Sequence, residues 1–168
     1  MLVRVIDVET TGMDPPADHA VCEIGWRDLL AEPDLAGGWT NWAIGGGGCA
    51  YVNPGRPIPP EASAVHHIID SDVRGAAPLA QAFAEISGGP DVYAAHNAKF
   101  ERQWITDATT GGKPWVCTYK AALRLWPEAP SHSNQALRYW RRPEGLNRGF
   151  ASFGHRAEPD AYVTAYLL

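Results

Sequence analysis

The residues most suited to chemistry near the start of the sequence are two carboxylates, Asp7 and Glu9, separated by a single valine. They stand at the end of an alternating, β-branched stretch, Leu2–Val8, which predicts a buried strand. Residues two apart in a strand share a face, with Cα atoms about 6–7 Å apart. Carboxylates this close repel unless a cation lies between them, and hard oxygen ligands suit Mg²⁺ or Mn²⁺. The pair indicates a metal site, although Asp-x-Glu alone is more often a solvated strand end.

A second segment with chemical potential is His96-Asn97-Ala98-Lys99-Phe100-Glu101. It follows a predicted strand, 91–95, and opens a predicted helix, 98–107. Sites in open α/β sheets gather where strands end and helices begin. Taken alone, Glu101 is more simply interpreted as a surface residue of that helix.

The third segment, His155-Arg156-Ala157-Glu158-Pro159-Asp160, precedes the final apolar stretch. Proline suits the first turn of a helix, and the residue before it resists the α conformation. This predicts Asp160 in the first turn of a last helix, 159–168, and His155 in the loop before it. Asp160 shares a helix face with Val163, Thr164 and Leu167, so it should point inward, where a carboxylate needs a partner such as a metal.

The elements that must position these residues follow from composition and pattern. The chain has 168 residues, of which 45% are hydrophobic and 20% charged, which fits one globular domain, 1–168. Two further strands are expected at 21–28 and 49–52, with the glycine-rich segment 37–48 as a loop or irregular hairpin. Helices are expected at 60–67, 78–86, 118–126 (capped by Thr118) and from Ser131 or Ser133 to Arg141. Three strands followed by alternating strands and helices predict an α/β fold with a mixed central sheet flanked by helices.

Composition also excludes several classes of protein. No apolar run approaches the roughly 18 residues of a transmembrane helix, and the N-terminal apolar stretch is too short for a secretory signal. The three cysteines are distant and odd in number, which argues against a disulfide framework or a zinc knuckle and fits a reducing compartment. The sequence therefore predicts a cytoplasmic protein without a membrane partner.

Charge is distributed unevenly along the chain. Residues 1–98 carry four arginines against 13 acidic residues, a net charge of −9, whereas residues 99–168 carry ten basic against six acidic residues, a net charge of +4. This asymmetry is compatible with an acidic metal site beside a basic phosphate-binding flank, although most charge imbalances are simply solvated faces. The candidates for such a flank are Arg124, Arg138, Arg141, Arg142 and Arg148.

Taken together and in this order, Asp7-Val8-Glu9-Thr10-Thr11-Gly12, His96-Asn97…Phe100-Glu101 and His155…Asp160 resemble the DnaQ-like 3′–5′ exonucleases of the DEDDh type. The resemblance extends along nearly the whole chain. Trp115-Val116-Cys117-Thr118 and the segment from His155 to Tyr162 are most similar to the exodeoxyribonuclease X branch.

The resemblance implies a ribonuclease-H-like fold and two-metal hydrolysis of phosphodiester bonds at single-stranded DNA or RNA 3′ ends, with release of nucleoside monophosphates. Asp7, Glu9, Glu101 and Asp160 would hold two Mg²⁺ or Mn²⁺ ions, and His155 would be the general base, as its near-neutral reference pKa allows. The terminal nucleotide would contact a further set of residues: Thr10, Thr11, Gly12, Met13, His66, Asn97 and Phe100. Met13 and Phe100 are equally compatible with an ordinary core.

One position departs from the family pattern, because Glu101 stands where an aspartate is usual. The extra methylene moves the carboxylate by about 1.5 Å. Two other functions therefore stay open: a nucleic-acid-binding module of the same fold with impaired catalysis, and a different metal phosphoesterase. His155, five residues before Asp160, favours the exonuclease, since a binding module needs no base. The sequence does not decide between DNA repair and RNA processing, or between a monomer and a homodimer.

Overall fold

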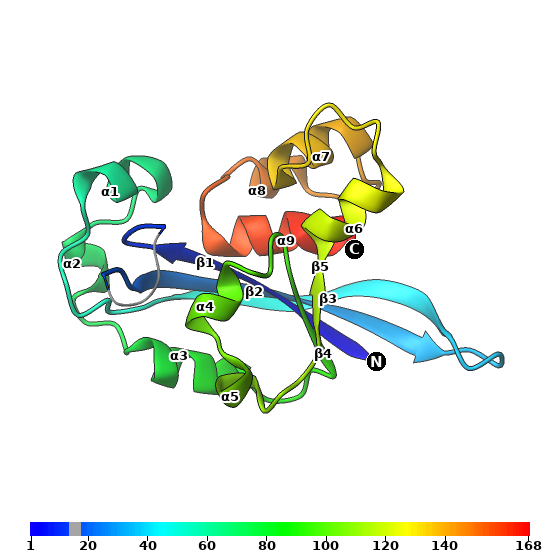
Figure 1. Cartoon of the computed structure of the whole chain (residues 1–168), viewed down its shortest axis with the longest axis horizontal. Helices are drawn as coiled ribbons and strands as arrows, with labels where there is room; N and C mark the ends of the chain where they lie inside the picture. Colours follow the sequence, from blue (N-terminus) through cyan, green and yellow to red (C-terminus); the bar gives the residue numbers. More distant parts are fainter. Residues whose placement is uncertain (14–17) are drawn as a thin grey trace.

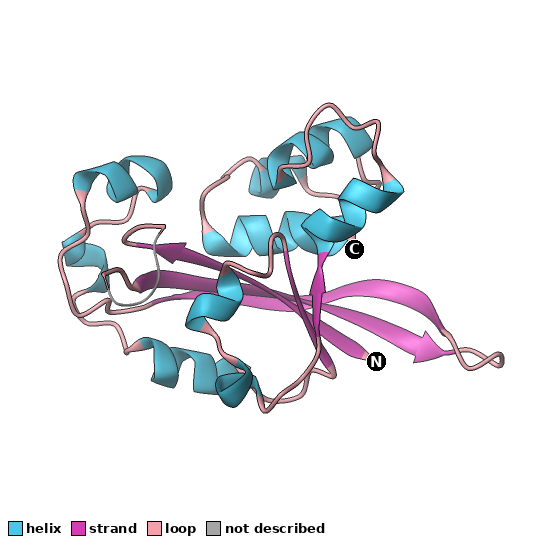
Figure 2. Ribbon diagram, in the orientation of Figure 1, coloured by secondary structure: helices cyan, strands magenta, loops and turns pink. Residues whose placement is uncertain are grey.

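The computed structural model describes residues 1–13 and 18–168 and is built on one five-stranded mixed sheet (Figures 1 and 2). The strands are β1 (Leu2–Thr10), β2 (Val21–Pro33), β3 (Trp39–Tyr51), β4 (Val92–Ala95) and β5 (Trp115–Cys117), in the order β3-β2-β1-β4-β5. The first three strands are antiparallel, and β4 is parallel to both β1 and β5. The predicted α/β fold with a mixed sheet is confirmed.

Helices cover both faces of this sheet. Their bounds are α1 (Pro60–His66), α2 (Asp70–Val73), α3 (Leu79–Ile86), α4 (Glu101–Trp104), α5 (Asp107–Thr110), α6 (Thr118–Leu125), α7 (Asn134–Arg141), α8 (Arg148–Ala151) and α9 (Ala157–Leu167). In Figure 1, α9 lies along one face with α6, α7 and α8 near it, and α3 lies on the other. None of the helices among the described residues combines the length and the apolar character needed to cross a membrane.

The two-residue period of β1 decides which side chains face which helix layer. Val3 and Val5 pack with Ala161 and Ala165 of α9. Ile6 and Val8, which point to the opposite face, pack with Phe83 of α3 in the other core. Residues 7 and 9 have the parity of residues 3 and 5, so their carboxylates face the layer that contains α9.

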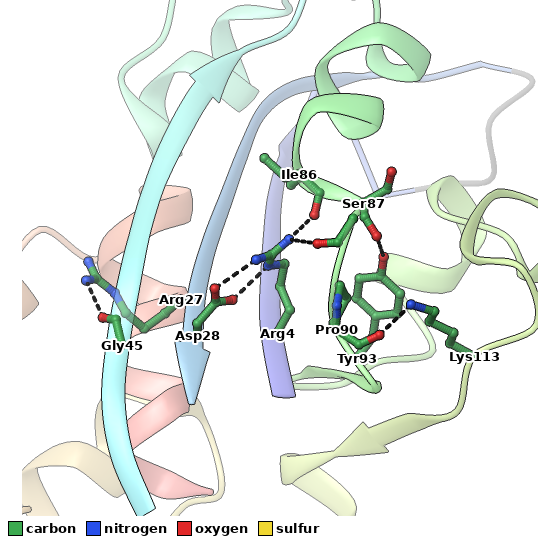
Figure 3. A network of polar contacts seen from close by, with 10 residues as sticks. Arg4, Arg27, Asp28, Gly45, Ile86, Ser87, Pro90, Tyr93 and Lys113 are labelled. Carbon is green, nitrogen blue, oxygen red and sulfur yellow. Dashed lines mark hydrogen bonds and ion pairs between the residues drawn. The ribbon is translucent and has the colours of Figure 1, made fainter. Parts of the chain in front are cut away.

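The opposite face of β1 also carries a buried cation, Arg4 (Figure 3). Its guanidinium donates two 2.7 Å hydrogen bonds to Asp28 on β2 and further bonds to the carbonyls of Ile86 and Gly88 at the end of α3. Charge-assisted bonds of this kind are stronger than neutral ones. The hydrogen bonds of Arg4 therefore link β1 to β2 and to the C-terminal end of α3.

The glycine-rich segment 37–48, expected to be a loop or an irregular hairpin, forms the hairpin and is largely part of β3. It pairs with β2 in an antiparallel hairpin whose register shifts twice. A Cβ at Gly47 would lie 2.5 Å from Arg27 and from the Trp26 carbonyl, and one at Gly48 would lie 2.9 Å from the Trp26 ring. The glycines therefore allow large side chains of β2 to lie against β3, rather than breaking the strand.

Two expectations about local structure were wrong. The predicted helix 98–107 is interrupted, since α4 ends before Ile105, whose φ of −110° and ψ of 87° are not helical. Thr118 does not cap α6, because its hydroxyl bonds the His96 ring at 2.9 Å and the Ala95 carbonyl. Ser133 takes the N-cap position of α7, in agreement with the expected helix from Ser131 or Ser133 to Arg141, although its side chain makes no capping hydrogen bond. The short elements β5, α2 and α8 had no predicted counterpart, because four residues or fewer give no clear periodicity.

Candidate metal centre

Three carboxylates from two elements meet where β1 ends and α9 begins. Asp7 and Glu9 lie near the C-terminal end of strand β1, and Asp160 lies in the first turn of α9. One carboxylate oxygen of each residue lies within 4.8 Å of those of the other two. Asp160 is 9% exposed, and Asp7 and Glu9 are half-buried, so the cluster is partly shielded from water. An all-oxygen donor set of this kind fits Mg²⁺ or Mn²⁺.

Asp160 is held in place by hydrogen bonds to both carboxylate oxygens. Gln135 of α7 donates to one at 2.6 Å, and the backbone N–H of His155 donates to the other at 2.7 Å. Asn134 donates to the Asp160 carbonyl at 3.0 Å. Neither of these α7 residues was expected at the site from the sequence, since Gln and Asn at the start of a helix carry no specific signal.

His155 lies in the loop before α9, as predicted, and its side chain is exposed. Its backbone has a φ of 60°, in the left-handed region that non-glycine residues adopt rarely. The bond from its N–H to Asp160 helps to hold this conformation. The loop therefore ties the position of the imidazole to one of the three carboxylates.

A fourth buried carboxylate, Glu23 of β2, anchors the start of α9. It lies opposite Glu9 in the β1–β2 register and is 1% exposed. It accepts bonds from Arg156 at 2.6 and 3.1 Å and from the Ala157 N–H at 2.9 Å. At Gly25, two residues further along β2, a Cβ would lie 2.2 Å from the Ala157 backbone, so α9 starts directly against the strand.

Sequence reasoning missed Glu23. A single acidic residue inside the otherwise apolar run Val21-Cys22-Glu23-Ile24 was the available signal, because a charge in a buried strand needs a partner. That partner, Arg156, stands beside His155 in the third motif.

Burial and mutual repulsion disfavour ionisation of the acidic cluster. Burial raises the pKa of Glu9 to about 8, assisted by the charges of Asp160 and Glu23. The pKa of Asp7 is raised well above its usual range by burial and then by Asp160, Glu9 and Glu101. Burial also raises the pKa of Asp160, against the opposing effect of its hydrogen bonds from Gln135 and His155. A divalent cation removes this repulsion and lets the carboxylates ionise.

Glu101 lies beside the acidic cluster but outside the group of three. It begins α4, is 3% exposed, and its Oε2 has no hydrogen-bond partner among the described residues. Burial raises its pKa to about 8, and the charge of Glu9 adds to the shift. An unpaired buried carboxylate is costly, so Glu101 is a candidate ligand for a second cation.

A pocket of about 470 Å³ opens next to Glu9. It contains six of the seven residues predicted to contact a nucleotide, together with the predicted general base His155; the six are Thr10, Thr11, Gly12, Met13, His66 and Phe100. Asn97 does not line it; this residue is exposed at a φ of 73°, and its carbonyl accepts the Phe100 N–H at 2.8 Å. The pocket also contains residues that sequence reasoning missed: His19, Glu61, Ala62 and Val65.

His66 contributes to the pocket wall from a buried position. Its Nδ1 accepts the Ile68 N–H at 3.1 Å, so the neutral ring carries its proton on Nε2. Burial lowers its pKa, because desolvation disfavours the charged ring. Its Nε2 lies 3.7 Å from the Sγ of Cys22, so both ring nitrogens have partners that hold the ring in the pocket wall.

Comparison with known proteins places this geometry in a family. The family model RNase_T, described as an exonuclease, matches residues 5–168. Exodeoxyribonuclease 10 of Escherichia coli K12 is 33% identical over 172 residues, covering 99% of this chain and 67% of the relative. A DNA polymerase III subunit epsilon-like protein of Rhodobacter capsulatus is 32% identical over 104 residues, covering 60% of this chain and 14% of the relative.

Solved structures give the same result. Exonuclease X in complex with 5′ overhanging duplex DNA is 32% identical with a TM-score of 0.71, covering 98% of this chain and 87% of that one. The zinc-bound complex of E. coli ExoI with single-stranded DNA has a TM-score of 0.68 at 16% identity, covering 98% of this chain and 38% of that one. The second likeness concerns the fold alone.

The contacts of Glu23 predict a local role in holding the start of α9. Glu23→Gln should lower the free energy of unfolding by about 2 kcal/mol, since it removes one partner of a buried pair whose arginine is partly solvated. It should also accelerate amide hydrogen exchange at Ala157 and Asp160, which native-state exchange measures residue by residue.

Asp28→Asn is the matched control, because it breaks another buried arginine pair of β2 away from α9. It should destabilise the protein to a similar extent but leave the relative protection of Ala157 and Asp160 unchanged. Equal acceleration in both variants would show that Glu23 contributes only to global stability.

Proposed function

Because this chain belongs to the RNase_T family of DnaQ-like exonucleases and resembles exodeoxyribonuclease X, we propose that it is a metal-dependent 3′–5′ exonuclease that releases nucleoside monophosphates from DNA ends. The single observation that carries the proposal is the acidic cluster of Asp7, Glu9 and Asp160 beside a pocket that also contains His155. We treat residues 1–168 as one exonuclease domain.

In this proposal Asp7, Glu9 and Asp160 hold one divalent ion, and Asp7 and Glu101 hold the second. Two such ions, when bound, stabilise the attacking and leaving oxygens of an in-line displacement. The protein supplies the fixed carboxylates. Their placement is supported by the hydrogen bonds to Asp160 and by the Glu23 anchor of α9, which leave little freedom at that ligand.

His155 acts as the general base in this scheme. Its imidazole accepts the proton of the attacking water, and the backbone bond to Asp160 keeps the ring at the edge of the acidic cluster. General bases of this kind contribute about 10²–10⁴ to a rate. An exposed ring can pass its proton to solvent after each turnover.

The pocket beside Glu9 receives the 3′-terminal nucleotide. Thr10 closes the turn after β1 by donating its hydroxyl to the Gly12 carbonyl at 2.6 Å. Met13, 76% exposed at the end of this turn, offers a polarizable side chain that can pack on a base, and Phe100 lies in the same pocket. A DNA substrate is proposed from the names of the relatives, one an exodeoxyribonuclease and one a structure with duplex DNA.

Polarity and metal dependence test the proposal directly. A single-stranded oligonucleotide labelled at its 5′ end should shorten stepwise from its 3′ end in Mg²⁺ or Mn²⁺ and stay intact in EDTA, as resolved on a denaturing gel. Early release of the 5′ label, or cleavage that persists in EDTA, would contradict it. His155→Ala is the companion variant, expected to slow single-turnover cleavage by about 10²–10⁴-fold while oligonucleotide binding is retained.

Substitutions at Glu101 separate charge from length. Glu101→Gln keeps the size but removes the charge, so it should reduce cleavage strongly, whereas Glu101→Asp should retain activity or improve it. Mn²⁺, which is less demanding of geometry than Mg²⁺, should rescue the variants better in a metal titration of the rate. Wild-type rates for Glu101→Gln would remove Glu101 from the metal centre. If the unmodified chain binds oligonucleotides but cleaves none with either metal, the binding-module alternative holds.

A further inference from the structure

A groove of about 870 Å³ lies at the β5 edge of the sheet. Its floor is β5, the three-residue edge strand Trp115–Cys117. One wall is formed by the turn before α4 together with α4 and the start of α5, and the other by α6. We name it the β5 groove.

Basic side chains line both walls of the β5 groove. Lys99 and Arg102 come from the α4 wall, and Lys120 and Arg124, four residues apart on one face of α6, come from the other. All four are exposed. The only acidic residue in the lining is Asp107, which binds Arg102 at 2.9 Å. The groove therefore carries a net charge of +3 in a chain whose net charge is −5.

The β5 groove shares the α4 segment with the nucleotide pocket. Phe100 lines the nucleotide pocket, and Glu101, next in the chain, is buried beside the acidic cluster. Lys99 and Arg102, the residues on either side of this pair, line the groove instead. The four-residue segment from Lys99 to Arg102 thus separates the acidic cluster and the nucleotide pocket from the basic groove.

Two basic residues of the flank expected from the sequence, Arg138 and Arg141, are less suited to binding a polyanion. Arg138 is 5% exposed and donates to Gln135 and to the Ala151 carbonyl. Arg141 lies over the Trp126 ring, 4.9 Å from its centroid. Of the flank expected from the sequence, only Arg124 lines the β5 groove, and that expectation missed Lys99, Arg102 and Lys120.

We propose that the β5 groove binds the phosphodiester backbone of the substrate at nucleotides beyond the one being removed. The proposal rests on the exonuclease function proposed above. A row of exposed cations favours a polyanion of regular charge spacing, and binding there releases the counterions condensed on the nucleic acid. The groove and the nucleotide pocket are lined by neighbouring residues of one short segment, Lys99 to Arg102. This proximity favours a strand of the same nucleic acid over a separate acidic protein.

The test removes two groove charges with Lys120→Ala and Arg124→Ala together, leaving Phe100 and Glu101 untouched. Oligonucleotide binding, measured by fluorescence anisotropy in EDTA, should weaken by about tenfold. The slope of log affinity against log salt should become shallower by about 1.4 for a single strand. Hydrolysis of the p-nitrophenyl ester of thymidine 5′-monophosphate, which has one nucleoside and no further phosphates, should be unchanged, whereas KM should rise for long oligonucleotides.

The matched control is Arg142→Ala with Arg148→Ala, which removes two exposed charges around a different hollow. It should leave the salt slope nearly unchanged. Equal loss in both double variants, or an unchanged slope in the groove variant, would overturn the proposal. Loss of binding to a polyglutamate peptide with unchanged oligonucleotide binding would overturn it in favour of an acidic protein partner.

Single-stranded and duplex oligonucleotides distinguish the strand that the groove holds. If the Lys120→Ala, Arg124→Ala variant binds single strands more weakly than the wild type does, the groove holds the cleaved strand. If it binds only duplexes more weakly, the groove holds the complementary strand. The anisotropy measurement of binding, made in EDTA, does not depend on catalysis. A wild-type protein that binds with the expected slope but hydrolyses neither substrate would therefore refute the exonuclease proposal without refuting the groove.

Discussion

The constraint on which this structure depends is the repulsion between carboxylates that the fold holds together in a buried place. Asp7, Glu9 and Asp160 lie within 4.8 Å of one another, and Glu101 is buried beside them. No arrangement of apolar side chains favours such a cluster, because buried charges are costly unless they are neutralised or paired. The pKa values of Asp7, Glu9 and Glu101 are raised because burial and neighbouring charges disfavour their ionised forms. A divalent cation bound between the carboxylates would offset this repulsion.

Ion pairs and hydrogen bonds just outside the acidic cluster hold the elements that carry it. Glu23 binds Arg156 and the first N–H of α9, Arg27 binds Glu158 at 2.6 Å, and Gln135 holds Asp160 from α7. These contacts join β2, α7 and α9 around the carboxylates without neutralising them. The pairs are mostly shielded from solvent, so loss of one partner would cost far more than loss of a surface ion pair.

The sequence predicted the parts of the site that depend on short-range geometry. The alternation of β1 placed Asp7 and Glu9 on one face, and Pro159 indicated the first turn of the helix that carries Asp160. The predicted start at residue 159 was wrong by two residues, because α9 begins at Ala157 and includes Glu158, the residue before the proline. The sequence could not predict contacts that depend on tertiary packing. Glu23 and Gln135 bind partners more than 20 residues away in the sequence. The glycines of β3 leave space for the side chains of Trp26 and Arg27 on β2. Thr118 forms a hydrogen bond with His96 instead of capping α6. The basic groove likewise joins residues of α4 and α6 that sequence order keeps apart.

The most direct test of the account is the melting temperature as a function of pH, in EDTA and in Mn²⁺, for the wild type and Asp160→Asn. Glu9 and Glu101 have pKa values of about 8 in the folded state, above their ordinary value of 4.5, so the folded protein retains protons that the unfolded chain loses. In EDTA, wild-type stability relative to Asp160→Asn should therefore fall as pH rises from about 5 to about 8. Mn²⁺ should stabilise the wild type most at pH 8 and the variant far less. A wild-type melting temperature at pH 8 that Mn²⁺ leaves unchanged would contradict the claim that these carboxylates form a metal centre.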